Sequence, residues 1–183
     1  MRIVGGQWRG TRLAALGKGD AAAHLRPTSD KVRESLFNVL EHGGYSALDG
    51  ARVLDLFAGT GALSFEALSR GAAEACLVDD GAKSAALIRQ NIERLQCLDR
   101  VKLLRKSALK LGQSAEAYDL IFLDPPYGKG LGERALTAAL AGGWVAEGAV
   151  ILWEESARIT PPVGLTIADR RRYGETEITL LLR

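Results

Sequence analysis

The sequence predicts an α/β fold built on a mostly parallel sheet. From residue 51 onward, apolar strand-like runs alternate with segments of helical periodicity, a pattern typical of a doubly wound sheet. Residues 165–173 and 176–182 favour two further strands joined at Gly174, so an antiparallel hairpin should end the sheet. The other expected strands are 52–57, 75–79, 101–105, 118–123 and 149–153, and the expected helices are 62–70, 82–95 and 132–140.

The amino-terminal part departs from this alternation. Residues 1–13 contain short β-prone pieces separated by glycines, which predicts a small β-hairpin, and residues 14–25 lack periodicity and should form a loop. A capped amphipathic helix is then expected from about residue 28 to 41. With 183 residues in all, we divide the chain into a basic extension, residues 1–25, and one domain, residues 26–183.

Composition argues against several classes of protein. The two cysteines and two histidines have no metal-ligand spacing, so no metal site is expected. Nothing resembles a signal peptide, and the apolar runs are too short to span a bilayer, so we expect a cytoplasmic protein with reduced thiols and no membrane partner.

Basic residues gather at the amino-terminal end. Residues 1–33 hold seven lysines and arginines and two aspartates, a net charge of +5, whereas 17 basic and 20 acidic residues elsewhere leave −3. A polyanion would bind at such an end, although a solvated basic face gives the same pattern.

The stretch VLDLFAGTGAL, residues 53–63, carries the first candidate site. Asp55 interrupts an apolar strand, where a buried carboxylate is costly unless a polar partner such as a ligand satisfies it. Gly59 and Gly61 permit positive φ, so backbone can approach a bound molecule at the start of a helix. Strand, loop and helix end together predict a nucleotide-type site, with a simple packing turn as the alternative.

The same loop lacks the marks of other nucleotide sites. No Lys-Ser/Thr follows its glycines, which argues against a phosphate-binding P-loop, and Ser64 replaces the third glycine of a dinucleotide fingerprint. About twenty residues further on, Asp79 and Asp80 close another apolar run. A carboxylate there is suited to bind the two hydroxyls of a ribose.

The second motif is Asp124-Pro125-Pro126-Tyr127, which ends the apolar run YDLIFL. Two prolines cannot continue a sheet ladder, so the chain leaves the strand with fixed φ angles and free carbonyls. Asp124 offers carboxylate oxygens, Pro125 offers a carbonyl and Tyr127 offers an aromatic face. An ordinary Pro-Pro turn beside a surface aspartate is the alternative.

This set of groups suits attack by an exocyclic amine of a nucleobase. Such an amine is a poor nucleophile because its lone pair is delocalised into the ring. Two acceptors that hold its hydrogens favour a pyramidal nitrogen whose lone pair can attack. The ring face of Tyr127, rather than its hydroxyl, is the part expected to act, by stacking on the base.

The two motifs together resemble those of the S-adenosylmethionine-dependent amino methyltransferases, which implies a Rossmann-like class I methyltransferase fold. The stretches RIVGGQWRG and RPTSDKVRESLFNVL, which begin the chain, resemble the bacterial RsmD-type methyltransferases that modify a guanine N2 in small-subunit ribosomal RNA. The resemblance covers nearly the whole chain. DPPY is shared with DNA adenine methyltransferases, so the amino-terminal stretches carry the narrower assignment.

The resemblance also implies roles for individual positions. Asp79 would bind the ribose of S-adenosylmethionine, and Ser107 stands where an acidic residue often receives the adenine amino group. Asp124, Pro125, Pro126 and Tyr127 would form the catalytic loop. The cofactor-binding candidates are Asp55, Phe57, Ala58, Gly59, Thr60, Gly61, Asp79, Ser107, Ala108 and Asp124.

The expected partner is small-subunit (16S) ribosomal RNA or an assembling 30S particle, bound by a monomeric enzyme. Basic residues near the amino terminus would meet RNA phosphates, and an indole there would stack on a base. The candidates are Arg2, Trp8, Arg9, Arg12, Arg26, Lys31 and Arg33.

Three alternatives stay open at this stage. A DNA adenine-N6 methyltransferase would need a module that reads duplex sequence, and no such insertion separates the two motifs. An NAD-binding oxidoreductase would use Gly59, Gly61 and Asp79 but would leave DPPY without a role. An RNA-binding module without catalysis would not need an intact DPPY.

Overall fold

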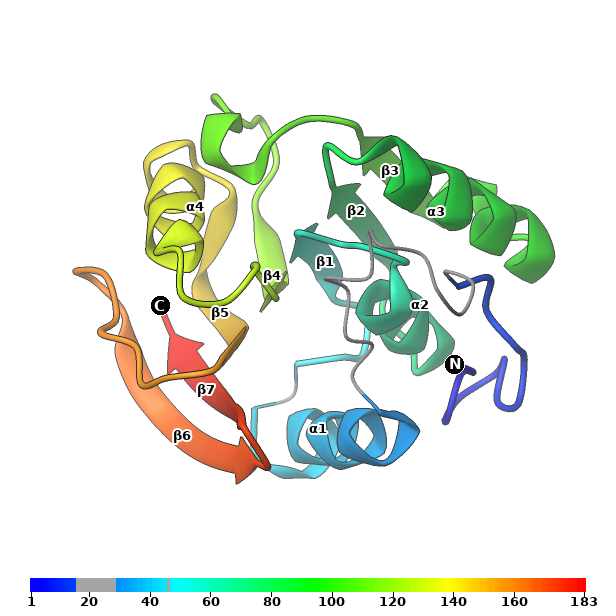
Figure 1. Ribbon diagram of the computed structural model, residues 1–183, viewed down its shortest axis with the longest axis horizontal. Helices are drawn as coiled ribbons and strands as arrows, with labels where there is room; N and C mark the ends of the chain where they lie inside the picture. Colours follow the sequence, from blue (N-terminus) through cyan, green and yellow to red (C-terminus); the bar gives the residue numbers. More distant parts are fainter. Residues whose placement is uncertain (16–28, 46) are drawn as a thin grey trace.

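A seven-stranded sheet with the order β3-β2-β1-β4-β5-β7-β6 forms the centre of the computed structural model (Figure 1). The structure describes residues 1–15, 29–45 and 47–183. Strands β1 to β5 run parallel, and β7 pairs antiparallel with both β5 and β6. The strands are β1 (Arg52–Leu56), β2 (Glu74–Val78), β3 (Val101–Leu104), β4 (Tyr118–Leu123), β5 (Val145–Glu155), β6 (Thr166–Tyr173) and β7 (Thr176–Leu182).

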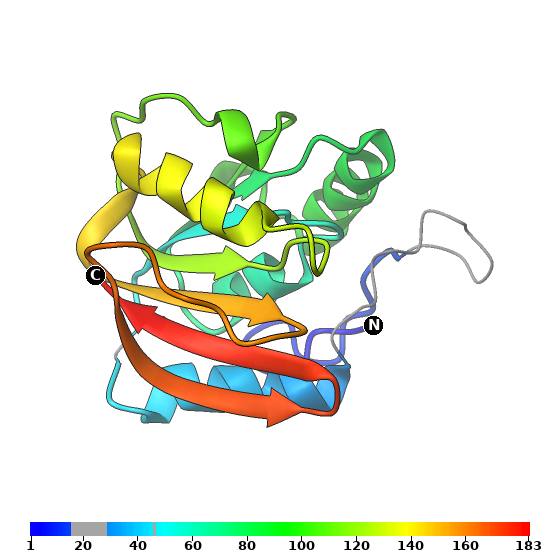
Figure 2. The same ribbon diagram turned by 60° about the vertical axis from the view of Figure 1, so that its left-hand side comes forward.

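Helices cover both faces of the sheet. On one face, α1 (Asp30–His42), α2 (Ala62–Ser69) and α3 (Ala82–Leu95) pack in one apolar cluster with the side chains that the strands direct to that side. On the other face, α4 (Leu131–Ala141) and the short 3-10 helix η2 (Ala108–Lys110) pack in a second cluster. Figure 2 shows α1 lying beneath β5, β7 and β6. This layering confirms the predicted α/β fold with its terminal antiparallel hairpin.

Strand β5 is the element that differs most from its prediction. It begins at Val145 rather than at residue 149 and continues to Glu155. Exposed Glu147 and Gly148 interrupt the apolar pattern of its first half, and Gly148 has a φ of +77°. The pairing between β4 and β5 also shifts register between Tyr118 and Leu120. A bulge of this kind keeps a strand paired through residues that break its apolar pattern.

The amino-terminal hairpin is smaller than expected. Residues 1–15 turn back on themselves, but they form only one antiparallel bridge, between Arg2 and Arg12. Backbone hydrogen bonds between Ile3 and Thr11 and between Leu13 and Met1 extend this pairing. Most of the expected loop 14–25 lies outside the described residues.

Candidate active site

Three parallel strands end level with one another at one edge of the sheet. Leu56, the last residue of β1, pairs with Val78 of β2 on one side and with Leu123 of β4 on the other. Asp79 and Asp124, which follow those partners, therefore leave the sheet on either side of the loop after β1. This is the carboxyl edge, where open α/β sheets bind ligands.

The loop after β1 is held in one conformation by its own backbone. The N–H groups of Phe57 and Ala58 both donate to the Val78 carbonyl oxygen, each over 3.1 Å. Phe57 has a φ of +67°, a conformation that costs a non-glycine residue about 1–3 kcal/mol and is concentrated at functional sites. Gly61 has a φ of +76°, and a Cβ there would lie only 2.6 Å from the Phe65 ring. A glycine is therefore favoured at position 61 both by the positive φ and by the close packing of the Phe65 ring.

Asp55 is buried near the end of β1, just before this loop. Its side chain is 2% exposed, and Ser64 Oγ donates to its Oδ2 over 2.7 Å. The pKa of Asp55 is raised to about 7, chiefly by burial and also by the nearby Asp79 charge, and the Ser64 hydrogen bond opposes both effects. Ser64 lies in the first turn of α2 and supplies a polar partner for the buried carboxylate. The sequence pattern had suggested that a ligand would be that partner.

Asp79 joins the two loops that flank it. Its Oδ2 accepts from the Gly59 N–H, and its Oδ1 accepts from the Gly81 N–H, both over 2.8 Å. Each carboxylate oxygen has two acceptor positions, so these bonds leave acceptor capacity for a ligand. The half-buried carboxylate therefore fixes the glycine loop whatever else it binds.

Ser107 is turned toward the chain that follows it. Its hydroxyl caps η2 by accepting from the Leu109 N–H over 3.3 Å, and Ala108 beside it is buried. The hydroxyl is oriented by this cap, and its remaining capacity is one donor and one acceptor position.

Asp124 follows β4 in a crowded acidic environment. Its carboxyl group is partly buried, and the Pro125 next to it is buried. Burial raises the pKa of Asp124 well above its usual range, and the charges of Glu154, Asp55 and Glu155 raise it further. A carboxyl group in this setting holds a proton more readily than a solvated aspartate does.

Tyr127 is tied to the neighbouring strands by its hydroxyl. The hydroxyl donates to Glu154 Oε1 over 2.6 Å and lies 3.3 Å from Thr176 Oγ1. Burial and the hydrogen bond to Glu154 both raise the pKa of Tyr127. The ring is half-buried, whereas Pro126 is exposed. The expectation that only the ring face matters is therefore incomplete, because the hydroxyl has a partner.

Sequence reasoning missed three residues at this edge. Ser64 supports Asp55, Glu154 receives the Tyr127 hydroxyl, and Thr176 lies beside that hydroxyl. Glu154 had a detectable signal, because it follows an apolar run just as Asp79 and Asp124 do. Ser64 and Thr176 have no comparable mark in the sequence.

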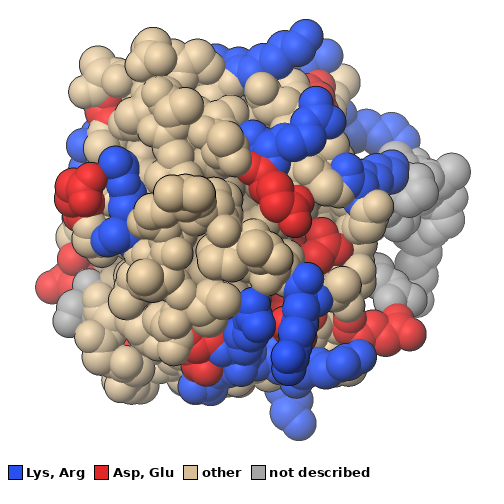
Figure 3. All heavy atoms as spheres, turned by 90° about the vertical axis from the view of Figure 1, so that its left-hand side faces the viewer, with Lys and Arg blue, Asp and Glu red and all other residues tan. Residues whose placement is uncertain are grey.

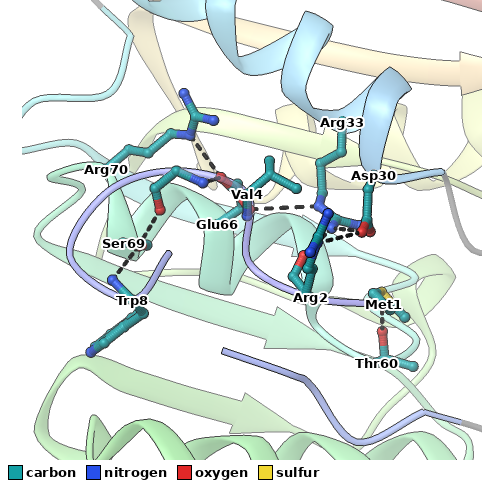
Figure 4. A network of polar contacts seen from close by, with 11 residues as sticks. Met1, Arg2, Val4, Trp8, Asp30, Arg33, Thr60, Glu66, Ser69 and Arg70 are labelled. Carbon is teal, nitrogen blue, oxygen red and sulfur yellow. Dashed lines mark hydrogen bonds and ion pairs between the residues drawn. The ribbon is translucent and has the colours of Figure 1, made fainter. Parts of the chain in front are cut away.

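Buried side chains anchor the amino-terminal segment to α2 (Figure 4). Glu66 is fully buried, and its two oxygens accept from the N–H groups of Val4 and Gly5, each over 2.8 Å. Arg33 and Arg70 flank this carboxylate, with nitrogen–oxygen distances of 3.6 and 2.7 Å. The paired charges and hydrogen bonds compensate the cost of burying Glu66.

The anchored segment also contacts the glycine loop. Thr60 Oγ1 lies 3.8 Å from Met1 Sδ. Asn91 of α3, which is fully buried, accepts from the Ala14 N–H over 2.7 Å and donates to the Thr60 carbonyl over 3.1 Å. The amino-terminal extension and the candidate cofactor loop therefore share one hydrogen-bond network.

The candidate RNA contacts within the described residues divide into three groups. Arg2, Arg9, Arg12 and Lys31 are exposed, although Arg2 pairs with Asp30 over 3.2 Å. The Trp8 ring is half-buried and lies under the Arg100 guanidinium, 5.5 Å from it. The expectation for Arg33 is wrong, because its side chain is 1% exposed and pairs with Asp30 and Glu66. Arg26 lies outside the described residues.

Two features are absent from the described ranges. Outside the segments 16–28 and 46, no group of three or more His, Cys, Asp or Glu side chains is arranged to hold a metal ion. In the same parts of the chain, none of the helices combines the length and the apolar character that crossing a bilayer requires.

Comparison with known proteins decides the family. The model of a family described as conserved hypothetical protein 95 matches residues 1–182. The chain is 36% identical over 188 residues to ribosomal RNA small subunit methyltransferase D of Escherichia coli, a match covering all of this chain and 90% of that protein. The chain belongs to the RsmD family.

Solved structures agree with RsmD-family membership. The chain matches yhhF of Escherichia coli, described as a proposed methyltransferase, with a TM-score of 0.87, 32% identity and coverage of 100% of this chain and 97% of that one. A proposed SAM-dependent methyltransferase from Streptococcus mutans matches with a TM-score of 0.58 and 18% identity, over 84% of this chain and 48% of that one. The second likeness shows the fold alone, which is the Rossmann-like methyltransferase fold.

Proposed function

We propose that this RsmD-family chain transfers a methyl group from S-adenosylmethionine to the exocyclic N2 amine of a guanine in small-subunit (16S) ribosomal RNA. The observation that carries the proposal is the pairing of Leu56 with Leu123, which sets the glycine loop beside the Asp124–Tyr127 loop. The curated relative in Escherichia coli is named for methylation of ribosomal RNA of the small subunit.

The residues at the edge fit S-adenosylmethionine, which supplies a methyl group on a positively charged sulfur. The loop from Asp55 to Gly61 would hold its methionine part, and Asp79 would bind the ribose. Three carboxylates, Asp55, Asp79 and Asp124, meet here, and the pKa values of Asp55 and Asp124 are raised by burial and by neighbouring negative charge. A cationic ligand would relieve that repulsion.

The second loop would hold the amine. The Asp124 carboxylate and the Pro125 carbonyl each accept a hydrogen from the guanine amino group, so the nitrogen lone pair points toward the methyl donor. An N–C bond forms as the S–C bond breaks, and the surplus proton of the nitrogen passes to Asp124. Its raised pKa suits that task.

Tyr127 would stack on the extruded base. Stacking contributes about 1–3 kcal/mol per base, which offsets much of the few kcal/mol needed to extrude it from a helix. Because the reaction otherwise needs only correct alignment at roughly 3 Å, positioning should dominate its rate. Exposed Arg9, Arg12 and Lys31 are the proposed phosphate contacts.

The test supplies methyl-labelled S-adenosylmethionine with small-subunit particles, free ribosomal RNA and DNA. Digestion and mass spectrometry then identify the labelled nucleoside, with Asp124→Ala as the matched control. Label in N2-methylguanosine from ribosomal RNA is the expected result. Label in N6-methyladenine of DNA, or tight binding of NAD without methyl transfer, would overturn the proposal.

A further inference from the structure

Two glutamates at the end of β5 contact the catalytic loop at consecutive residues. Glu154 accepts from the Tyr127 hydroxyl over 2.6 Å, and Glu155 Oε1 accepts from the Gly128 N–H over 3.2 Å. Figure 2 shows why they meet, because β4 and β5 point to the same edge, with the turn between β6 and β7 beside them. These two contacts therefore join the loop after β4 to the last two residues of β5.

Glu154 is placed at a cost that needs an explanation. Its residue is 4% exposed, and the Asp124 carboxylate is near enough for the two charges to repel. A buried carboxylate beside another acid is unfavourable unless its hydrogen bonds compensate. The short bond from Tyr127 is such a bond, with Thr176 adding a hydroxyl 3.3 Å from the same phenol oxygen.

The loop that carries Tyr127 has no regular secondary structure to fix its ring. Residues 124–130 form no helix or strand, and Gly128 and Gly130 have φ values of +71° and +59°. A ring on such a segment would rotate between orientations, whereas stacking on a base requires one orientation. A hydrogen bond at the far end of the phenol fixes the ring plane without covering its face.

We propose that Glu154 is a positioning residue that orients the Tyr127 ring through its hydroxyl, with Glu155 holding the following residue. This inference rests on the proposed function, because it assigns the ring the task of stacking on the target base. Glu154 itself touches neither base nor methyl donor in this account.

A double-mutant cycle tests the route through the hydroxyl. Tyr127→Phe and Glu154→Leu should each lower the single-turnover methylation rate at least tenfold, and the double variant should be no slower than the slower single variant. Glu154→Gln should stay within about threefold of the wild type, since the amide oxygen can accept the same hydrogen bond. Effects of the two substitutions that multiply would overturn the inference.

A spectroscopic arm separates positioning from general structure. The methylated guanine identified above is replaced by 2-aminopurine, whose fluorescence is quenched when it stacks on an aromatic ring. Glu154→Leu should lose this quenching while its affinity for S-adenosylhomocysteine stays within twofold of the wild type. Glu147→Gln, at the exposed start of β5, is the matched control and should change neither quantity.

Two outcomes distinguish a failure of this inference from a failure of the proposed function. If the wild-type protein methylates no nucleic acid, the proposed function fails, and the inference fails with it. If the wild type is active and Glu154→Leu retains both quenching and rate, only the positioning role is wrong.

If Glu154→Leu does not fold, the test uses Glu154→Gln and the double variant Tyr127→Phe/Glu154→Gln instead. In that pair, the added Glu154→Gln should not slow Tyr127→Phe further, and a further slowing would overturn the inference.

Discussion

Leu56 and Leu123 pair across β1 and β4, so the two motifs singled out in the sequence leave the sheet as neighbours. The glycine loop follows Leu56 and the DPPY loop follows Leu123. Under the proposed function, a methyl donor and an amine would meet between these two loops.

Replacing Asp124 with alanine should abolish most of the activity. Under the proposed function, the substitution removes an acceptor that would hold the amine and the group that would take its proton. We expect kcat/KM to fall more than a hundredfold, a loss of about 3 kcal/mol of transition-state stabilisation. Methylation kinetics on the substrate that the labelling test identifies measure this. Turnover within a few fold of the wild type would remove Asp124 from the mechanism.

Asp55 should make the protein less stable as the pH rises toward the pKa of this residue in the folded state. In the folded state its pKa is raised to about 7 from an ordinary value of 3.8, so between these values the folded state binds the proton and the unfolded state does not. The free energy of unfolding therefore falls as pH rises from about 4 to 7, by up to about 4 kcal/mol from this group. Asp55→Asn should flatten that dependence and raise the melting temperature at pH 8. A melting curve against pH with the same slope in both proteins would contradict the assignment.

Glu154 should control the acid limb of the pH–rate profile. Its charge, with those of Asp55 and Glu155, disfavours ionisation of Asp124. Under the proposed function, ionised Asp124 is the form that would accept from the amine. Activity should rise with pH as Asp124 ionises, and Glu154→Gln should move that rise to lower pH because it removes one negative neighbour. The single-turnover rate measured against pH checks this. A rise at unchanged or higher pH would show that Glu154 does not act on Asp124.

Glu66→Gln should release the amino-terminal segment from α2. The amide would present a donor to one of the Val4 and Gly5 N–H groups, which both donate to the carboxylate, and would leave Arg33 and Arg70 without its charge. Trypsin should then cut after Arg9 and Arg12 at least tenfold faster than in the wild type. The exposed Glu34→Gln is the control. Equal cleavage rates in all three proteins would mean that Glu66 does not hold the segment.

Removing Arg9 and Arg12 together should weaken RNA binding without affecting the methyl donor. If each contacts one phosphate of a single strand, the slope of log affinity against log salt should fall by about 0.7 per residue. Arg171→Ala/Arg172→Ala on β6 removes the same charge elsewhere and should leave the slope unchanged. Figure 3 shows basic and acidic side chains interleaved on that face, and Arg171 pairs there with Asp169. A steeper loss in the β6 variant would relocate the RNA surface.

Much of the fold was predictable because its signals are local. Apolar runs mark β1, β2 and β4, and their ends fix where Asp79 and Asp124 leave the sheet. The start of β5 was missed because exposed Glu147 and Gly148 hide it.

Of the candidate site, only the two sequence motifs could be predicted. The burial of Arg33 depends on Glu66, which is 33 residues away in sequence, and nothing near Arg33 indicates it. The partner of the Tyr127 hydroxyl likewise lies on another strand. Contacts of this kind depend on tertiary packing, which charge counts and periodicity do not report.

A crystal structure with S-adenosylhomocysteine tests the central claim most directly. We predict density along the glycine loop from Asp55 to Gly61, with the ribose at Asp79 and the sulfur facing the Asp124 carboxylate. A sulfur that points away from Asp124, or a ligand bound at another edge of the sheet, would contradict the account.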